Sequence, residues 1–403
     1  MVGNSHSWFV VAKTVSVTSA PPARRVFFGG VAESALGVVT DQTELEMAAE
    51  ASLAALQQTR VKSADVDTIY ALGLGDAGPL KLARVLSCQP ARIGTTDVGG
   101  SSFGMYVDEA KRAIEAGQSE VVLIAYASRQ RSRRSRHVQF GGSDPVPDLA
   151  GLMAPVGLPS PIGDHALLAS RYLHRYKATS DDLAMIAVTA RQWASLNEKA
   201  WSRDPLTLDE ARESPMVSTP LRKVDCCLVT DGGGAVVLIS EPVAVASDLP
   251  RVAVLGTGVG LGGWSITQAW DSNQRGGALS ARLALQAAGI RPDEIDIVEP
   301  YDNFTISVLM QLEDLGLCEV GEAAGFVADV GLGPEGGLPA MTSGGGLSYC
   351  HPGKLGLLLL IEGIRQLRGE CGARQVHGPK TAVVHAVGGT SSAAASTVVI
   401  ART

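Results

Sequence analysis

The chain has 403 residues, of which 45% are hydrophobic and only 5% aromatic, and it contains 46 glycines. This length predicts two or three domain-sized units, and the composition favours packed α/β layers over a fibrous or disordered chain. A formal net charge of −7 provides no general attraction to nucleic acid. The sequence has no uninterrupted apolar window of about 20 residues, so no membrane span is predicted.

The six cysteines include no Cys-x-x-Cys pair, so neither a zinc site nor a secreted disulfide framework is indicated. We therefore expect free thiols in a cytoplasmic protein, with no metal site and no bound cofactor. Cys226 and Cys227 precede an apolar run and are expected to be buried structural thiols. Residues 1–24 are predicted to be an N-terminal extension outside the fold.

Strands and helices alternate after this extension. Residues 25–31 predict a short strand, residues 43–58 a helix and residues 66–72 a second strand. Thr43 fits the N-cap of the helix because Glu46 follows three residues later, which is the capping-box pattern. A β-α-β order of this kind predicts parallel strands with a right-handed crossover.

A similar order of elements returns 229 residues later. Residues 48–69 align with the stretch that includes residues 281–298, and residues 25–31 match residues 251–258 with a small offset. Chance agreement between two ordinary amphipathic helices is one explanation. We favour a duplicated α/β fold, because the order of the elements agrees as well.

A long insertion, residues 128–221, separates the regular parts of the two halves. A structureless loop of this length is uncommon in a compact protein, so we expect a small helical subdomain. Helices are predicted at residues 166–176 and 180–197. Ser180 is the expected N-cap of the second helix, because two aspartates follow it in the first turn.

The insertion opens with a cationic run of five arginines within eight residues: Arg129, Arg131, Arg133, Arg134 and Arg136. Arginine forks suit phosphate oxygens, so Arg129 and Arg131 are candidate substrate-binding residues. A solvated face or a subunit contact is the alternative explanation. RNA binding is not predicted, because no aromatic residues interleave the run.

Residues 341–356, MTSGGGLSYCHPGKLG, combine a glycine run with three titratable side chains, and an apolar helix is predicted after them at residues 357–367. Glycines allow a bent backbone and the close approach of a ligand, and here they lead to Tyr349, Cys350 and His351. A turn before a buried helix, with a core histidine, is the simpler explanation.

This stretch resembles the NxSGGxxSxGHPxGxxG loop of the thiolase superfamily. His351 falls on the histidine that helps to build an oxyanion hole in that family, and Cys350 stands in the family's glycine position. The resemblance implies an α/β thiolase fold with duplicated α-β-α-β-α layered halves, mixed five-stranded sheets and an inserted helical loop domain. The N-terminal half would comprise residues 25–127 and 222–245, the loop domain residues 128–221 and the C-terminal half residues 246–403.

Both thiolase cysteines are missing from the matching positions. Residues 95–104 match the nucleophile loop and place Gly99 in the nucleophile's position, while residues 385–392 match the second-cysteine loop and place Ala386 there. A neighbouring serine would need a positioned base to act as a nucleophile. Acyl transfer through a cysteine is therefore not predicted.

The family's third catalytic loop reads Asn-Glu-Ala-Phe or His-Asp-Cys-Phe, and here it reads Tyr-Asp-Asn-Phe at residues 301–304. This loop opens the stretch 301–326, which together with residues 348–353 and 364–376 resembles the lipid-transfer-protein and sterol-carrier-protein thiolase-like group. Within that group the match is to the aldolases of steroid side-chain breakdown. Members carry a tyrosine in each of two loops, matching Tyr301 and Tyr349.

The resemblance implies an acyl-CoA aldolase that cleaves a β-hydroxyacyl-CoA to a ketone and a shorter acyl-CoA without a cysteine nucleophile. Tyr301 and Tyr349 would move protons, and His351 with glycine-loop amides would hold the thioester oxygen. The loop glycines are Gly99, Gly100, Gly345 and Gly388, and the implied substrate contacts are Asp302, Asn303, Arg129 and Arg131.

The resemblance also implies a homodimer, paired through the edge strand near residues 92–96, and an OB-fold, zinc-ribbon partner that would complete a heterotetramer. Two other functions stay open at this point. One is a thiolase-like acyltransferase or condensing enzyme, and the other is a non-catalytic acyl-CoA or lipid-binding subunit.

Overall fold

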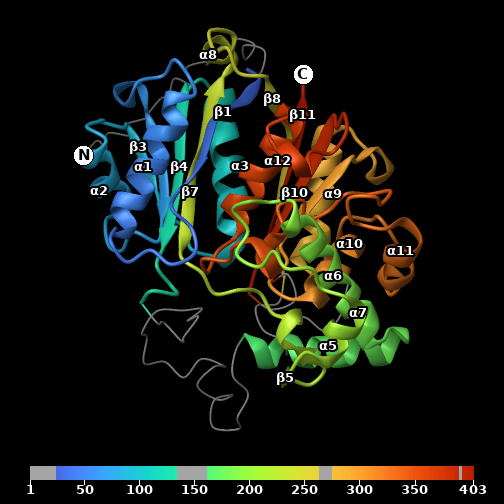
Figure 1. The fold of residues 1–403 in the computed structure, drawn as a ribbon. Helices are drawn as coiled ribbons and strands as arrows, with labels where there is room; N and C mark the ends of the chain where they lie inside the picture. Colours follow the sequence, from blue (N-terminus) through green and yellow to red (C-terminus); the bar gives the residue numbers. More distant parts are fainter. Residues whose placement is uncertain (1–23, 134–160, 263–274, 390–392) are drawn as a thin grey trace, which may run out of the picture.

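One mixed sheet runs through the molecule (Figure 1). The computed structural model describes residues 24–133, 161–262, 275–389 and 393–403. Within these residues, nine strands follow the order β3-β2-β4-β7-β1-β8-β11-β10-β9. The strands are β1 (Val26–Glu33), β2 (Thr68–Leu72), β3 (Arg92–Gly94), β4 (Val121–Ser128), β7 (Gly232–Ser240), β8 (Val252–Leu261), β9 (Ile297–Pro300), β10 (Thr381–Gly388) and β11 (Ala394–Arg402).

The two halves share this sheet through the pairing of β1 with β8. Phe27 pairs with Ala253 and Phe28 with Val252 in an antiparallel register. The N-terminal half contributes five strands, as predicted. In the described part of the C-terminal half there are four strands, and an isolated bridge between Val298 and Ala340 lies where a fifth strand was expected.

Helices cover both faces of the sheet, which explains why strands such as β4 are apolar along nearly their whole length. On one face α3 (Ser102–Glu115) and α12 (Gly356–Arg368) build a shared core with both halves. On the other face α1 (Glu44–Gln57) and α2 (Gly78–Val85) cover the N-terminal half. The C-terminal half is covered there by α9 (Gly276–Ala288) and α10 (Thr305–Asp314). The short α8 (Glu241–Val245) and α11 (Ala323–Val330) complete the two halves.

The predicted internal repeat is visible in the local hydrogen bonding. Asp65 accepts the N–H of Lys62 at 2.8 Å in the first half, and Glu294 accepts the N–H of Arg291 at 2.8 Å in the second. Each of these turns is followed by a parallel strand, β2 or β9. The agreement of backbone turn, carboxylate cap and strand at the same spacing supports duplication over chance similarity.

The predicted helix N-caps can be compared with the observed ones at α1 and α6. Thr43 caps α1 as predicted, with the Glu46 N–H donating to Thr43 Oγ1 at 3.2 Å. The predicted N-cap Ser180 is wrong, because Thr179 has the extended backbone of the cap and Ser180 is the first helical residue. Asp182, three residues after Thr179, accepts the Thr179 N–H at 2.6 Å and completes the capping box.

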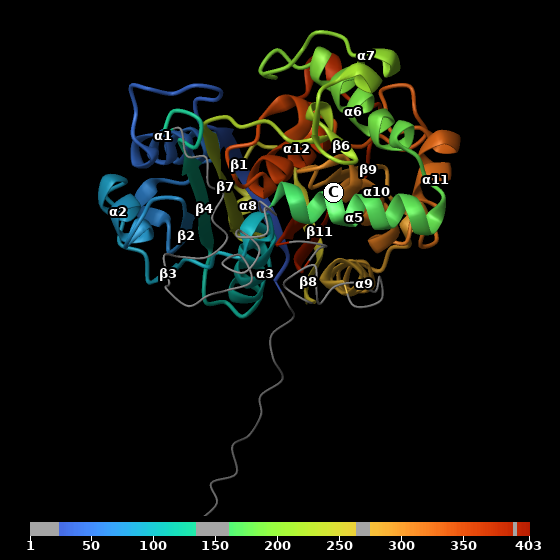
Figure 2. The ribbon, with the colours of Figure 1, turned by 90° about the horizontal axis from the view of Figure 1, so that it is seen from below.

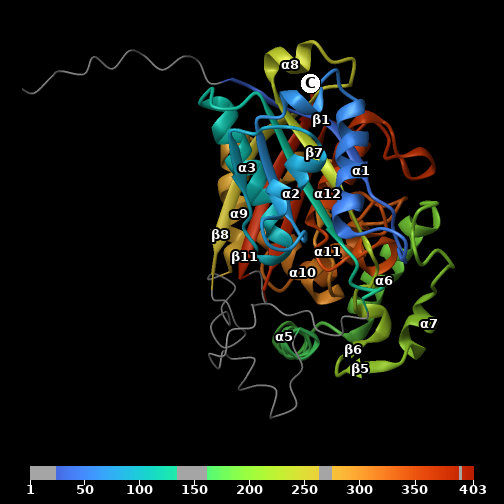
Figure 3. The same cartoon turned by 90° about the vertical axis from the view of Figure 1, so that its left-hand side faces the viewer.

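The insertion is mainly helical where the structure describes it. It contains α5 (Ile162–Tyr176), α6 (Ser180–Ser195), α7 (Leu208–Glu213) and a small hairpin of β5 (Met216–Ser218) and β6 (Leu221–Arg222). Figures 2 and 3 show these elements gathered beside the C-terminal half, at one end of the molecule. Across the described ranges, no helix has the length and apolarity needed to cross a bilayer.

Candidate active site

Tyr301 directly follows β9 and is fixed by its own backbone. Its N–H donates to the His385 carbonyl at 3.0 Å and to Gln311 Oε1 at 2.8 Å, and its carbonyl accepts from Gln311 Nε2 at 2.7 Å. The ring lies against Gly100, where any Cβ would overlap it. Glycine at position 100 is therefore required for the tyrosine ring to reach its place.

The Tyr301 hydroxyl lies 3.2 Å from Nε2 of His351 and 3.3 Å from the backbone nitrogen of Leu355. The Leu355 N–H donates to the phenol oxygen, which keeps a second lone pair, so the histidine tautomer decides which group donates between Tyr301 and His351. The tautomer that is protonated at Nδ1 leaves Nε2 free to accept the phenol proton. The structure thus brings these two predicted site residues together.

Both members of this pair are neutral near pH 7. Burial lowers the pKa of His351 to about 4, so its imidazole carries no charge at neutral pH. Burial also raises the pKa of Tyr301 far above its ordinary value, so the phenol keeps its proton. A neutral phenol beside a neutral imidazole is suited to proton transfer, because neither group has to carry a charge in the buried site before the reaction begins.

The predicted nucleophile loop packs beside this pair. Gly99 has a positive φ of 74° and begins a short 3₁₀ turn that leads into α3. A Cβ at Gly388 would overlap the carbonyl of Val98, and a Cβ at Gly356 would overlap the carbonyl of Gly100. The turn is therefore pressed between the end of β10 and the start of α12.

The serines of this loop are used within it. Ser101 Oγ donates to the Val98 carbonyl at 2.9 Å, and Ser102 Oγ donates to the Gly99 carbonyl at 2.9 Å. Both residues are fully buried. Neither hydroxyl is poised as a nucleophile, because each already gives its proton to a backbone carbonyl.

Asp302 and Gly345 contact each other where the loop of Tyr301 meets the glycine-rich loop that leads to His351. The buried Asp302 carboxylate accepts the N–H groups of Gly346 at 2.6 Å and Leu347 at 3.0 Å. A Cβ at Gly345 would overlap that carboxylate. Burial raises the pKa of Asp302 to about 7. Asp302, predicted as a substrate contact, here joins the two catalytic loops to each other.

Asn303 joins the same loop to the insertion. Its Nδ2 lies 3.3 Å from Nε2 of His165, whose Nδ1 lies 2.8 Å from the carbonyl of Pro161. The His165 ring also stacks on Phe304, with ring centroids 4.2 Å apart. Sequence reasoning had assigned no role to His165, since nothing in its local sequence reveals a partner 138 residues away.

Tyr349 does not join Tyr301 and His351. Its hydroxyl donates to Glu33 Oε1 at 2.7 Å, and Arg365 donates to the same oxygen at 2.7 Å. Lys199 pairs with the other oxygen of Glu33. Arg365 lies nine residues after Gly356, about 14 Å along α12 at the usual helical rise. The tyrosine hydroxyl therefore points toward the far end of α12.

Glu33 is a site residue that the sequence analysis missed. Burial alone would raise its pKa, but Arg365 and Lys199 outweigh burial and lower the pKa to about 2. Its charge is therefore fixed across the physiological range. The only local signal was a carboxylate closing the otherwise uncharged strand β1, VFFGGVAE.

The predicted phosphate-binding arginines bind the chain's own carbonyls. Arg129 Nε donates to the Val39 carbonyl at 3.0 Å, and Arg131 Nη1 donates to the Val229 carbonyl at 2.9 Å. The Arg131 guanidinium also lies 4.6 Å from the ring centroid of Trp201. Arg134 and Arg136 lie outside the described residues. These contacts tether the start of the insertion to the N-terminal half.

The cysteines fit a structural role. Cys226 and Cys227 are partly rather than fully buried, and burial raises the pKa of Cys226 to about 12. The fully buried Cys350 lies 3.1 Å from Thr230 Oγ1. Among the described residues, no cluster of three or more His, Cys, Asp or Glu side chains could hold a metal ion.

Comparisons with known proteins point to one family. A family model described as thiolase C-terminal domain-like matches residues 258–401. The chain is 33% identical over 356 residues to the steroid side-chain-cleaving aldolase of Thermomonospora curvata, spanning 84% of this chain and 89% of that protein. It is 32% identical over 345 residues to the 17-hydroxy-3-oxo-4-pregnene-20-carboxyl-CoA lyase of Mycobacterium tuberculosis, spanning 81% and 87%. A solved structure of an Ltp2-ChsH2(DUF35) aldolase superposes with a TM-score of 0.84 and 28% identity, covering 94% of this chain and 98% of that one.

The duplicated halves, the inserted helices and the loops around Tyr301 and His351 define an enzyme of the thiolase type. The chain belongs to the thiolase superfamily, within the group that contains the sterol carrier protein 2 thiolases and the steroid side-chain-cleaving aldolases. The predicted family and fold class are thereby confirmed. Acetyl-CoA acetyltransferases are also among its relatives, so membership alone does not decide between lyase and transferase chemistry.

Proposed function

We propose that this chain is an acyl-CoA aldolase that cleaves the side chain of a β-hydroxyacyl-CoA, with a steroid-like acyl group, to a ketone and a shorter acyl-CoA. The observation that carries the proposal is the Tyr301–His351 pair beside a loop with Gly99 in the nucleophile's position. A retro-aldol reaction needs a proton acceptor and a place for an enolate, but it needs no nucleophile. The aldolase and lyase named above support the substrate class.

The first step would be transfer of the β-hydroxyl proton. The Tyr301 oxygen accepts this proton while its own proton passes to Nε2 of His351, 3.2 Å away. The electron pair of the O–H bond becomes the second bond of the ketone carbonyl. The bond between the α and β carbons breaks, and its electron pair forms the thioester enolate.

The enolate would lie at the N-terminal ends of two helices. The Gly99–Ser101 turn leads into α3, and it is in van der Waals reach of Gly356 at the start of α12. Helix N-termini stabilise negative charge. The proton on His351 then returns through Tyr301 to the α carbon, which releases the shorter acyl-CoA and restores the neutral pair.

The remaining predicted residues take supporting roles in this proposal. Gly345 and Asp302 hold the two catalytic loops together, and Asn303 ties one of them to α5. Gly388 closes the site against Val98. Tyr349, whose hydroxyl is bound to Glu33, acts as a positioning residue for the loop that carries His351. Arg129 and Arg131 set the position of the insertion.

We also propose a homodimer formed through the edge strand β3, and an OB-fold, zinc-ribbon partner protein. Two residues of the three-residue β3, Arg92 and Ile93, are exposed, as an unpaired edge would be. The Ltp2-ChsH2(DUF35) structure is a complex of a related aldolase, which supports the expectation of a partner. Acyl transfer is the weaker proposal, because Gly99 and Ala386 replace both sulfur atoms.

The experiment is product analysis by mass spectrometry after incubation with a panel of β-hydroxyacyl-CoAs, with and without a zinc-ribbon partner. Ketone and shortened acyl-CoA in equal amounts would support the aldolase. A covalent acyl adduct on Ser101, Ser102 or Cys350 would instead favour a transferase, and binding without turnover in all conditions would favour a non-catalytic subunit.

A further inference from the structure

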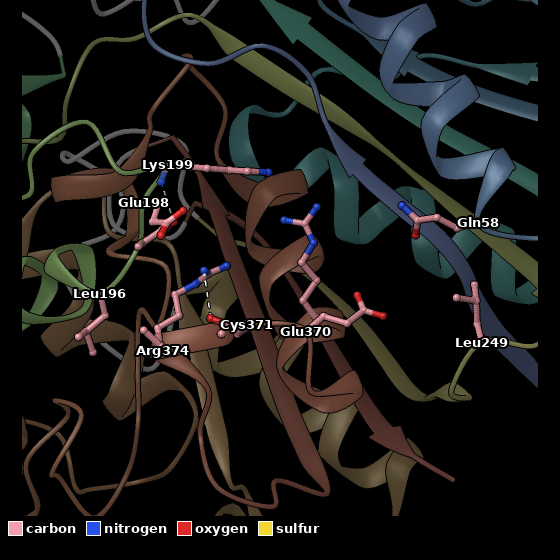
Figure 4. Close-up of a pocket in the computed structure, with 12 residues that line it drawn as sticks. Gln58, Leu196, Glu198, Lys199, Leu249, Glu370, Cys371 and Arg374 are labelled. Carbon is pink, nitrogen blue, oxygen red and sulfur yellow. Dashed lines mark hydrogen bonds between the residues drawn. The ribbon is translucent and has the colours of Figure 1, made fainter.

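A cavity of about 570 Å³ lies at the end of α12 opposite to Tyr301 and His351 (Figure 4). It is bounded by the residues after α6, by Arg365 in the last turn of α12 and by the turn that follows α12, residues 370–374. Leu249 and Gln58 close its other side. This volume falls in the range of small-molecule sites.

Three cationic side chains line the cavity: Lys199, Arg365 and Arg374. Each is held by a buried carboxylate. Glu362, with 3% of its side chain exposed, accepts two hydrogen bonds of 2.9 Å from Arg374. Glu33, with 5% exposed, accepts from Arg365 and pairs with Lys199. Side chains fixed in this way present their remaining N–H groups with little further loss of conformational freedom.

Arg365 is the best placed of the three to take a ligand. Within the described structure its hydrogen bonding uses Nη1 alone, and its side chain keeps 16% exposure. Burial alone would lower the pKa of Arg365, but Glu33 outweighs burial and raises it, so the guanidinium stays charged. A planar guanidinium with free N–H groups suits the oxygens of a carboxylate or phosphate.

The acidic residues of the rim define the size of the ligand. Glu198 and Glu370 line the same cavity and are exposed. The three cations also face the buried Glu33 and Glu362, so the cavity has no excess positive charge with which to hold a long polyanion. A long polyanion would meet the rim carboxylates, whereas a small oxyanion seated among the three cations would not.

We propose that this cavity is a binding site for a small oxyanion, a phosphate or a dicarboxylate, separate from the reaction centre. The site is linked to the catalytic loop through Glu33, which holds both Arg365 and the Tyr349 hydroxyl. Tyr349 precedes His351 by two residues. An anion bound to the remaining N–H groups of Arg365 and Lys199 competes with Glu33 for their positive charge without moving the side chains, so occupancy weakens the ion pairs that hold Glu33 beside Tyr349. The binding site itself does not depend on the proposed aldolase activity.

The test is isothermal titration of the full chain with inorganic phosphate and, separately, with malonate, at constant ionic strength set by sodium chloride. We expect saturable binding of one equivalent, and the arm that binds more tightly identifies the ligand class. Lys199→Gln should weaken binding about tenfold, the usual effect of losing one charge-assisted hydrogen bond. Glu370→Gln should strengthen it, because a repelling rim charge is removed.

Arg112→Gln on α3 is the matched control, because Arg112 is exposed and lies outside the cavity lining. Its affinity should equal that of the unmodified chain. The two cavity variants change exposed residues, so both are expected to fold, and thermal melts verify this. Absence of saturable binding, or equal affinities in all four proteins, would overturn the proposal. If phosphate and chloride gave the same heats at equal ionic strength, the signal would reflect general charge screening and not a binding site.

Discussion

The hydroxyl of Tyr301 and Nε2 of His351 face each other at 3.2 Å across two loops that are 50 residues apart in the sequence. Their rings are nearly perpendicular, at 82°. The Leu355 N–H also donates to the phenol oxygen, so a buried backbone group holds the phenol beside the imidazole. This one contact generates most of the predictions below.

Tyr301→Phe should lower kcat about 100-fold or more, the usual range for loss of a positioned proton-transfer group. The phenyl ring still packs on Gly100, but the buried Leu355 N–H loses its acceptor, so the free energy of unfolding should fall by about 1–3 kcal/mol. Steady-state kinetics with a β-hydroxyacyl-CoA, alongside a thermal melt, checks this. A variant that retains more than half of the activity would remove Tyr301 from the mechanism.

Activity should fall in acid as His351 takes a proton. Burial lowers the pKa of His351 to about 4, so the acceptor nitrogen is free above that pH and blocked below it. The pH profile of kcat should therefore show an acid limb near pH 4, well below the ordinary value for histidine near 6.5. His351→Gln should abolish that limb and most of the activity, while an unchanged limb would assign it to another group.

Gly100→Ala should displace Tyr301, because the added methyl group overlaps the ring. Overpacking of this kind costs about 1–3 kcal/mol of unfolding free energy, and kcat should fall with it. Gly325→Ala in α11 is the matched control, since a Cβ there meets nothing within 4 Å. Urea unfolding of both variants separates steric displacement from a general effect of losing a glycine.

Asp302→Asn should alter how stability depends on pH. Burial raises the pKa of Asp302 to about 7, above its unfolded value of 3.8, so the folded state binds the extra proton between these values. The contribution of Asp302 to the free energy of unfolding is fully present below about pH 4 and is lost as the pH rises through about 7. The asparagine of the variant does not titrate, so its free energy of unfolding does not fall in this pH range. The difference in stability between the variant and the unmodified chain should therefore be smaller at pH 8 than at pH 5. A deficit independent of pH would contradict the assignment.

Tyr349→Phe separates a positioning role from a catalytic one. The variant removes one hydrogen bond to the buried Glu33, a change that costs about 1–3 kcal/mol of unfolding free energy. We expect a lower melting temperature and a modest fall in kcat with an unchanged acid limb. A 100-fold fall in kcat without loss of stability would restore Tyr349 as a proton-transfer group.

The sequence predicted the elements best where local chemistry decides the structure. The Thr43 cap, the apolar helix α12 and the turns repeated before β2 and β9 depend on neighbours within a few residues. Motif register placed Tyr301 and His351 in loops that the fold brings together. The predicted cap Ser180 is displaced by one residue, because Thr179 has a carboxylate three positions later, Asp182, whereas the residue three after Ser180 is Leu183.

Contacts that the sequence could not predict are those of side chains whose partners are distant in the sequence. Residues Gly345–Tyr349 form a π-helical turn, and after it Tyr349 and His351 serve different clusters. Glu33, the partner of Tyr349, is 316 residues away, so no local pattern could reveal it. Arg129 and Arg131 are predicted substrate contacts, and no local pattern reveals that they also donate to the carbonyls of Val39 and Val229.

Gly99 also bears on chemical resistance. With no sulfur at that position, alkylating agents and peroxide find no nucleophile there to modify. Cys350 is buried, and burial raises its pKa to about 12, so almost none of it is the reactive thiolate. We therefore expect activity to survive oxidising conditions that would inactivate an enzyme that depends on a thiolate.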